Sequence, residues 1–329
     1  MKLRRFLILL TVTLTSLATL LPTGQAETPL IIGIAYDTGG PGDHSFDDAV
    51  AVGVTLAKKS FPIQVLATVT VGSEEDRESR LRFLVDKGAN SVIAVGSGYA
   101  AAVKIVSQKY PSRQFVIVND ASVSALNVAS LVFAEDQGGY LAGTAAALVS
   151  KKGKIGFIGT SGQSKAYESG YVLGARTAKK AIAIDIKYAP DSWGAVATSM
   201  ITGGADVIFL TTSGSDSDVI NSVVNANKKG AAVSLIVVEP DQYVTLAKGT
   251  KKYILASVMK RVDKAVLNFI SESVAGRSVV DVLNSKLGVY GRSYGIQNGG
   301  IELSLWSPSV IKYRKVINQA AKVAGKLFK

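Results

Sequence analysis

Short apolar runs alternate along the chain with longer segments in which apolar residues recur every three or four positions. A short run of this kind is typical of a strand buried on both faces of a parallel sheet, and the longer spacing is typical of a helix with one buried face. The runs predict strands at 30–36, 63–70, 91–95, 114–118, 130–133, 154–158, 184–188, 206–210, 234–238 and 253–257. The segments between them predict helices at 48–59, 74–87, 99–109, 138–151, 164–179, 195–202, 216–227 and 262–275.

This regular exchange of strand and helix predicts an α/β fold in which helices cover both faces of parallel sheets. Two similar phrases, Gly-Ala-Asn at 88–90 and Gly-Ala-Asp at 204–206, each stand between a predicted helix and a predicted strand. Each of these strands leads into a loop of glycine and serine, at 96–98 and 213–215. The repetition indicates two similar halves, each with its own sheet.

The expected organisation is a signal peptide followed by two lobes that the chain enters more than once. An apolar stretch at 6–21 follows three basic residues and precedes small residues that end at Ala26, which indicates an export signal. The stretch is about 16 residues long, shorter than the roughly 20 of a spanning helix, so cleavage is favoured over an uncleaved anchor. We expect a signal peptide at 1–26, an N-terminal lobe at 27–133 plus 257–287, and a C-terminal lobe at 134–256 plus 288–329. The mature protein is then exported, to the periplasm or the outer face of the cytoplasmic membrane.

Composition narrows the possible chemistry. The chain has 329 residues, no cysteine and one histidine, His44. The absence of cysteine excludes disulfides, thiolate metal sites and a lipidated cysteine. A single histidine leaves little basis for histidine-based metal sites or catalysis. The formal net charge is +12, but lysine pairs are spread along the chain, which is typical of a solvated surface rather than a nucleic-acid groove. Attraction to an anionic membrane surface is an open alternative.

The most promising candidate site is the loop after the first predicted strand. Asp37 ends that strand, two glycines follow, and Ser45, Phe46 and Asp47 stand where the next helical pattern begins. Ligands of open α/β sheets bind at the carboxyl ends of the strands, so these side chains should lie at the mouth of a cleft. Their carboxylates, hydroxyl and aromatic face suit a polar ligand with a flat ring. His44, in the same loop, is more typical of a loop surface than of a metal site.

Other polar residues follow predicted strands at the same edge of the sheets, namely Asp120, Glu239 and Lys260. A single carboxylate in such a place often caps a helix or forms a turn. Several together suit the adjacent hydroxyls of a sugar, with Lys260 donating to a hydroxyl or neutralising the acids. Hydrolysis by two such acids is conceivable, but no spacing singles out an acid/base pair.

A second aromatic residue, Trp193, lies in a polar loop after the predicted strand at 184–188. It either covers an edge of the core or, with Phe46, sandwiches a planar ring from the opposite lobe. The glycine segments at 96–98 and 153–159 match neither a dinucleotide fingerprint nor a P-loop, so no cofactor is expected.

Several motifs occur in a fixed order over nearly all of the chain after residue 26. D-x-G-G and D-x-S-F stand at 37–40 and 43–46, G-K-I-G-F-I-G stands at 153–159, and Ser-Val-Met-Lys stands at 257–260. The segment 133–143 is similar to F-x-x-E-x-G, with aspartate in the place of the glutamate. This order resembles the basic membrane protein (Bmp/PnrA-type) family of ABC-transporter substrate-binding proteins, whose best-understood type is a purine nucleoside receptor.

The resemblance implies a type I periplasmic-binding-protein fold, with two Rossmann-like lobes, a hinge, and a ligand in the cleft between the lobes. With Ser45 of the same loop, the ligand-binding residues it implies are Asp37, Phe46, Asp47, Asp120, Trp193, Gly214, Glu239 and Lys260. The aromatic pair would stack on a base, with Asp37 and Asp47 at the base end and the others at the ribose end. Asp47 replaces the usual asparagine and Glu239 the usual aspartate. The ligand is therefore a nucleoside, with a purine favoured, or another ring-bearing polar metabolite.

We accordingly expect an extracytoplasmic solute-binding protein, monomeric and working with an ABC transporter permease, without catalytic residues, metal, cofactor or nucleic-acid partner. A ligand-sensing or surface-interaction protein of the same fold is one alternative. A periplasmic nucleoside hydrolase is another, which the single histidine and the missing metal-ligand cluster disfavour.

Overall fold

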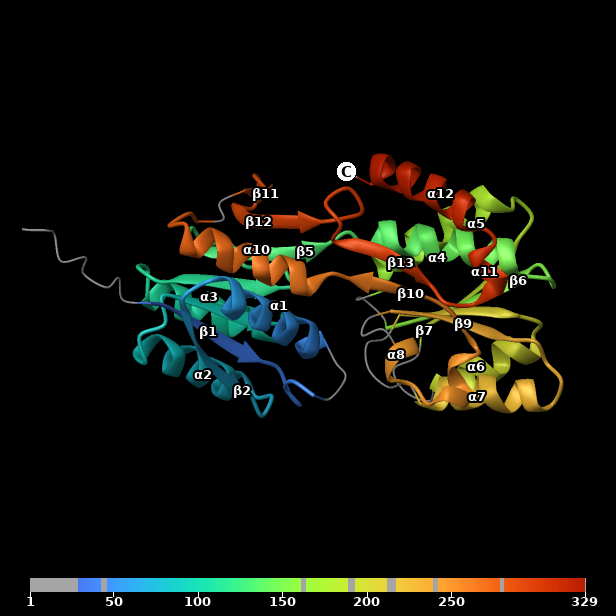
Figure 1. The fold of residues 1–329 in the computed structure, drawn as a ribbon, viewed down its shortest axis with the longest axis horizontal. Helices are drawn as coiled ribbons and strands as arrows, with labels where there is room; N and C mark the ends of the chain where they lie inside the picture. Colours follow the sequence, from blue (N-terminus) through green and yellow to red (C-terminus); the bar gives the residue numbers. More distant parts are fainter. Residues whose placement is uncertain are drawn as a thin grey trace, which may run out of the picture.

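Two lobes, each built on one twisted sheet, make up the computed structural model (Figure 1). It describes residues 29–42, 46–160, 164–188, 193–211, 217–238, 242–278 and 281–328, so the predicted signal segment at 1–26 lies outside the described residues. Most strand pairs in both sheets are parallel, and hydrophobic clusters lie on both faces of each sheet. The predicted α/β fold of two lobes is confirmed.

The sheet of the first lobe has the strand order β11-β12-β5-β4-β3-β1-β2. Its strands are β1 (Leu30–Tyr36), β2 (Ile63–Val69), β3 (Ser91–Val95), β4 (Gln114–Val118), β5 (Val128–Phe133), β11 (Val282–Asn284) and β12 (Val289–Tyr294). The helices α1 (Phe46–Ser60) and α10 (Val262–Val274) pack on one face, and α2 (Glu74–Asp86) and α3 (Ala100–Lys109) on the other. The short turn η1 (Ser97–Tyr99) leads into α3. Because β1 is buried on both faces, its residues are almost all apolar.

The sheet of the second lobe has the order β13-β10-β9-β8-β6-β7. Its strands are β6 (Lys154–Gly159), β7 (Ala183–Tyr188), β8 (Val207–Leu210), β9 (Ser234–Val238), β10 (Ile254–Lys260) and β13 (Ile301–Leu305). One face packs on α4 (Glu135–Val149), α5 (Lys165–Ala178), α11 (Pro308–Ile311) and α12 (Arg314–Leu327). The other face packs on α6 (Trp193–Thr202), α7 (Ser217–Lys228) and α8 (Gln242–Thr245), while α9 (Lys248–Lys251) precedes β10.

The helices α4 and α5 approach each other almost to backbone contact. A Cβ atom added to Gly143 of α4 would lie 2.0 Å from the carbonyl oxygen of Tyr171, and one added to Gly174 of α5 would lie 2.0 Å from that of Tyr140. No side chain larger than hydrogen fits at such a distance, so glycine at both positions sets the spacing of the helices. This close packing fixes the start of α5, which carries Tyr167 towards the space between the lobes.

The chain passes between the lobes at three places: from β5 to α4, from β10 to α10, and from β12 to β13. The β10 strand stays in the second sheet to Lys260, and β12 pairs in parallel with β5 in the first sheet, Tyr294 opposite Phe133. The sequence predicts that the chain crosses between the lobes at 257 and 287. The observed pairings instead keep 257–260 in the second sheet and 289–294 in the first. The sequence of β12, VYGRSY, lacks the apolar run from which strands were predicted. Among the described residues, no helix has the length and apolarity needed to cross a bilayer.

Candidate ligand-binding cleft between the lobes

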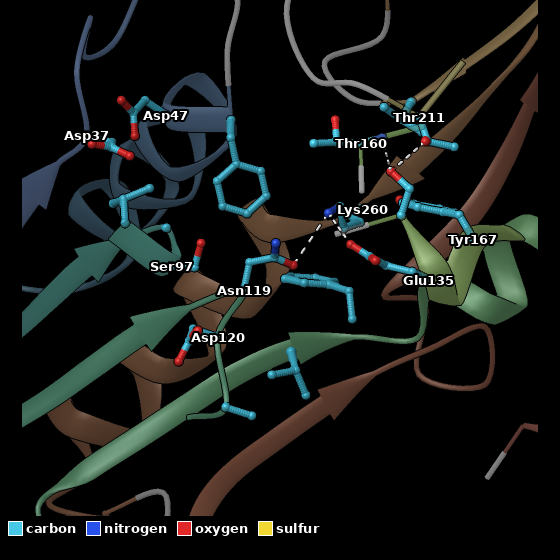
Figure 2. A pocket seen from close by; sticks show the side chains of 18 of the residues that line it. Asp37, Asp47, Ser97, Asn119, Asp120, Glu135, Thr160, Tyr167, Thr211 and Lys260 are labelled. Carbon is cyan, nitrogen blue, oxygen red and sulfur yellow. Dashed lines mark hydrogen bonds and ion pairs between the residues drawn. The ribbon is translucent and has the colours of Figure 1, made fainter. Parts of the chain in front are cut away.

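A cleft of about 750 Å³ opens where the carboxyl ends of the two sheets face each other (Figure 2). This volume is in the range of a small-molecule site. Figure 2 shows Asp37 and Asp47 on one side of the cleft, Tyr167 and Thr211 on the other, and Lys260 between them. Six of the nine residues predicted from the sequence line it: Asp37, Phe46, Asp47, Asp120, Trp193 and Lys260. The other three, Ser45, Gly214 and Glu239, lie outside the described residues, as does His44.

Lys260, at the end of β10, is the one cationic side chain among the described residues that line the cleft, and it is only 6% exposed. Its Nζ donates to Glu135 Oε1 at 2.7 Å and to Asn119 Oδ1 at 3.4 Å. The ammonium also lies 5.5 Å from the ring centre of Phe46 and 5.8 Å from that of Tyr167. A buried ammonium needs a nearby negative charge, and the carboxylate of Glu135 supplies it to Lys260. Lys260 therefore contacts residues of both lobes.

Asn119, the residue after β4, holds an unusual backbone conformation beside Lys260. Its φ of 64° makes it the one non-glycine residue with positive φ among those described. Asparagine adopts this region more readily than most residues, and its N–H is retained in the sheet by donating to Leu131 O at 2.8 Å. The turn directs the Asn119 amide into the cleft and starts the segment that carries Asp120.

The carboxylate of Asp120 takes part in a local turn as well as in the cleft wall. Its Oδ1 accepts from the N–H of Ser122 at 2.8 Å and from the Ser122 hydroxyl at 2.6 Å. The turn-forming role and the cleft-lining role considered from the sequence are therefore both present. The local bonds hold one carboxylate oxygen in place.

Asp47 is buried in the first turn of α1, at 2% exposure. The positive end of the helix dipole favours a carboxylate there. Burial, and secondarily the charges of Asp47 and Asp48, raise the pKa of Tyr36 to about 12. The end of β1 therefore keeps a neutral phenol beside the two acids near the cleft.

Asp37 forms an ion pair that has no signal in the sequence. Arg77, from the first turn of α2, donates to Asp37 Oδ1 at 3.0 Å. The two residues are 40 positions apart, and no spacing pattern links them. This contact depends on how α2 packs on the sheet.

The two aromatic residues line the cleft from opposite lobes. Phe46 begins α1 of the first lobe, and Trp193 begins α6 of the second. Trp193 also packs against the hydrophobic cluster beneath α6 and α7, so it covers a core edge while facing the cleft. The two interpretations considered for Trp193 are thus compatible.

Hydroxyl groups of the second lobe form a cluster that was not singled out from the sequence. The Thr211 hydroxyl donates to Ser164 Oγ at 2.9 Å, and Ser164 Oγ accepts from the N–H of Thr160 at 3.0 Å. All three residues line the cleft. Thr160 and Thr211 directly follow β6 and β8, so the strand-end rule that selected Asp37 could have found them. The described residues contain no group of three or more His, Cys, Asp or Glu side chains placed to hold a metal ion.

Comparison with known proteins shows what the chain as a whole is similar to. A family model described as "ABC transporter substrate-binding protein PnrA-like" matches residues 33–327. The chain is 30% identical over 270 residues to the CD4+ T-cell-stimulating antigen of Listeria innocua, covering 77% of this chain and 76% of that protein. It is 28% identical over 301 residues to the ABC transporter nucleoside-binding protein BmpA of Lactococcus lactis, covering 86% and 84%. In structure it is similar to an ABC transporter solute-binding protein from Aeropyrum pernix, with a TM-score of 0.71, 22% identity, and coverage of 91% and 90%.

Proposed function

The chain belongs to the PnrA-like family of ABC transporter substrate-binding proteins, and we propose that within this family it is an exported receptor that binds a nucleoside, with a purine favoured, in the cleft between its lobes. Membership confirms the resemblance seen in the sequence motifs. The Lactococcus lactis relative is named a nucleoside-binding protein, which supports the ligand class.

One observation carries the proposal: Phe46 and Trp193 line one cleft from opposite lobes, beside the carboxylates of Asp37, Asp47 and Asp120. Stacking between aromatic side chains contributes roughly 1–3 kcal/mol for a base, and carboxylates accept from base N–H groups and ribose hydroxyls. A free sugar would bring no planar ring to the aromatic pair, and a free base would bring no ribose hydroxyls to the carboxylates. A nucleoside uses both parts of the site.

Binding would bring the lobes together on the ligand about the three connecting segments, a hinge motion common to two-lobed receptors. The closed form is then the one that an ABC permease recognises. Nucleoside hydrolysis is not part of the proposal, since the family to which the chain belongs is one of substrate-binding proteins.

Isothermal titration of the mature protein with purine nucleosides, pyrimidine nucleosides, free bases and ribose tests the proposal, with chromatography of the recovered ligand. We expect a purine nucleoside to bind most tightly and to be recovered intact. Release of free base would identify a hydrolase instead. Binding of sugars alone, with no response to any nucleoside, would refute the nucleoside assignment.

A further inference from the structure

Arg77 stands next to the cleft without lining it. Its guanidinium contacts Asp37 from the side of α2, and its side chain is 13% exposed. The Asp37 side chain, at 36%, is the more accessible partner and does line the cleft. Any effect of Arg77 on a ligand therefore passes through Asp37.

The guanidinium of Arg77 is held in place on several sides. Nη1 donates to the carbonyl oxygen of Gly72 at 2.7 Å, and the guanidinium carbon lies 5.7 Å from the ring centre of Tyr99. A Cβ atom at position 98 would lie 2.9 Å from Nη2, so glycine there leaves room for the ion pair. The buried Tyr99 hydroxyl in turn donates to the carbonyl oxygen of Tyr36 at 2.9 Å, one residue before Asp37. The group is thus tied to the end of β1.

The two oxygens of Asp37 have different surroundings. Oδ1 accepts from Arg77 Nη2 at 3.0 Å and from the N–H of Thr38 at 2.9 Å. Oδ2 points towards Gly96, where an added Cβ atom would lie 3.5 Å from it. Gly96 lines the cleft with Asp37. Within the described part of the chain Oδ1 alone is occupied by hydrogen bonds, which leaves Oδ2 for a ligand.

We propose that Arg77 is a positioning residue that sets ligand specificity: by holding Oδ1, it presents Oδ2 as an acceptor for an N–H group on the edge of the ligand's ring. An ionised carboxylate accepts hydrogen bonds and donates none, so a ring edge without an N–H group has no partner at this place. The bond is charge-assisted, which makes it stronger than a bond between neutral groups. This inference rests on the proposed nucleoside function and adds a rule for which bases fit.

The test compares nucleosides that have an N–H group on the base with purine riboside, which has none. Titration calorimetry of the wild type with adenosine, inosine and guanosine should show at least one binding about tenfold or more tightly than purine riboside. In Arg77→Met this preference should fall to about threefold or less, since Asp37 loses its orientation. Arg77→Lys keeps the charge but lacks the planar fork, so its preference should be intermediate. Arg80→Met, on the same helix and paired with Asp76 at 3.0 Å, is the matched control and should keep the wild-type preference.

A double-mutant cycle with Asp37→Asn separates positioning from a general structural effect. If Arg77 acts through Asp37, Arg77→Met weakens binding of the preferred nucleoside about tenfold in the wild type but less than about threefold in Asp37→Asn. Equal losses in both backgrounds, or an unchanged preference over purine riboside in Arg77→Met, would overturn the inference and leave the receptor proposal standing. A wild type that binds no nucleoside would overturn both. Melting curves check that each variant folds, and Arg77→Lys replaces Arg77→Met in the cycle if the latter does not.

Discussion

The ammonium of Lys260 lies 2.7 Å from the carboxylate of Glu135, joining the end of β10 to the first residue of α4. Each of these residues stands beside a segment that passes between the lobes, from β5 to α4 or from β10 to α10. The pair therefore places a cation of the cleft wall next to the hinge.

Removing one member of the pair should cost more stability than removing both. Lys260→Met leaves the Glu135 carboxylate, 16% exposed, without its cation, and we expect the free energy of unfolding to fall by about 3 kcal/mol. In Lys260→Met/Glu135→Gln the uncompensated charge is gone, so part of that loss should be recovered. Urea unfolding of the wild type, Lys260→Met, Glu135→Gln and the double variant measures this, and additive losses would contradict it.

Each half of the aromatic pair should contribute to binding. Phe46→Ala and Trp193→Ala should each weaken binding of the preferred nucleoside by about 1–3 kcal/mol, or roughly 5- to 150-fold. The reason is that the base would lose the aromatic side chain that stacks on one of its two faces. Phe83→Ala is the matched control, since Phe83 lies on α2, is 47% exposed and does not line the cleft. Titration calorimetry measures the affinities, and wild-type affinity in both cleft variants would exclude the sandwich.

A phosphate on the ligand should be rejected. The described cleft wall holds the carboxylates of Asp37, Asp47, Asp120 and Glu135 against the single ammonium of Lys260. Two like charges about 8 Å apart at an effective dielectric constant of about 20 repel by about 2 kcal/mol, so a nucleoside 5′-monophosphate should bind about 30-fold more weakly than its nucleoside. A neutral 5′-methylthio nucleoside controls for size, and equal binding of nucleoside and monophosphate in competition titrations would contradict the charge argument.

Asp76 should give the protein an acid-sensitive contribution to stability. Hydrogen bonds from the Thr70 hydroxyl, the N–H of Val71 and Arg80 lower its pKa to about 2 from an ordinary 3.8. A carboxyl whose pKa is lower in the folded state stabilises it fully above the unfolded pKa, and this is lost as the pH falls towards about 2. The melting temperature of Asp76→Asn should therefore lie furthest below the wild type at neutral pH.

Between pH 4 and pH 2 that difference should shrink, because the wild type loses the same contribution by protonation. The exposed Glu75, on the same turn, supplies the control Glu75→Gln. A difference in melting temperature that stays constant from pH 7 to pH 2 would show that Asp76 does not act through its charge.

Gly143 should not tolerate a methyl group. The added Cβ would lie 2.0 Å from the carbonyl oxygen of Tyr171, so α4 and α5 would have to separate, and we expect Gly143→Ala to lower the free energy of unfolding by about 3 kcal/mol. Gly249→Ala is the matched control, because its Cβ meets nothing within 4 Å and its φ is not positive. Urea unfolding compares the two, and equal stabilities would contradict the close-packing account.

Much of the fold follows from residues that are close in sequence. The apolar runs that predict β1, β3, β4 and β9 are buried on both faces, and a strand in that environment has to be apolar throughout. Reasoning from apolar runs did not predict β12 and β13, because Gly291, Arg292 and Glu302 interrupt the apolar pattern there. Those strands form because β5 and β10 offer them open edges.

For the candidate site, too, some features were predictable from the sequence and others were not. Asp37, Asp120 and Lys260 could be placed at the carboxyl ends of strands from the sequence, because chain order and parallel pairing bring strand ends to one edge of a sheet. The sequence does not indicate that Glu135 neutralises Lys260 or that Arg77 holds Asp37, because both contacts arise from tertiary packing. These partners are 125 and 40 positions apart, and such distant groups meet only after α4 and α2 have packed on the sheets of their own lobes.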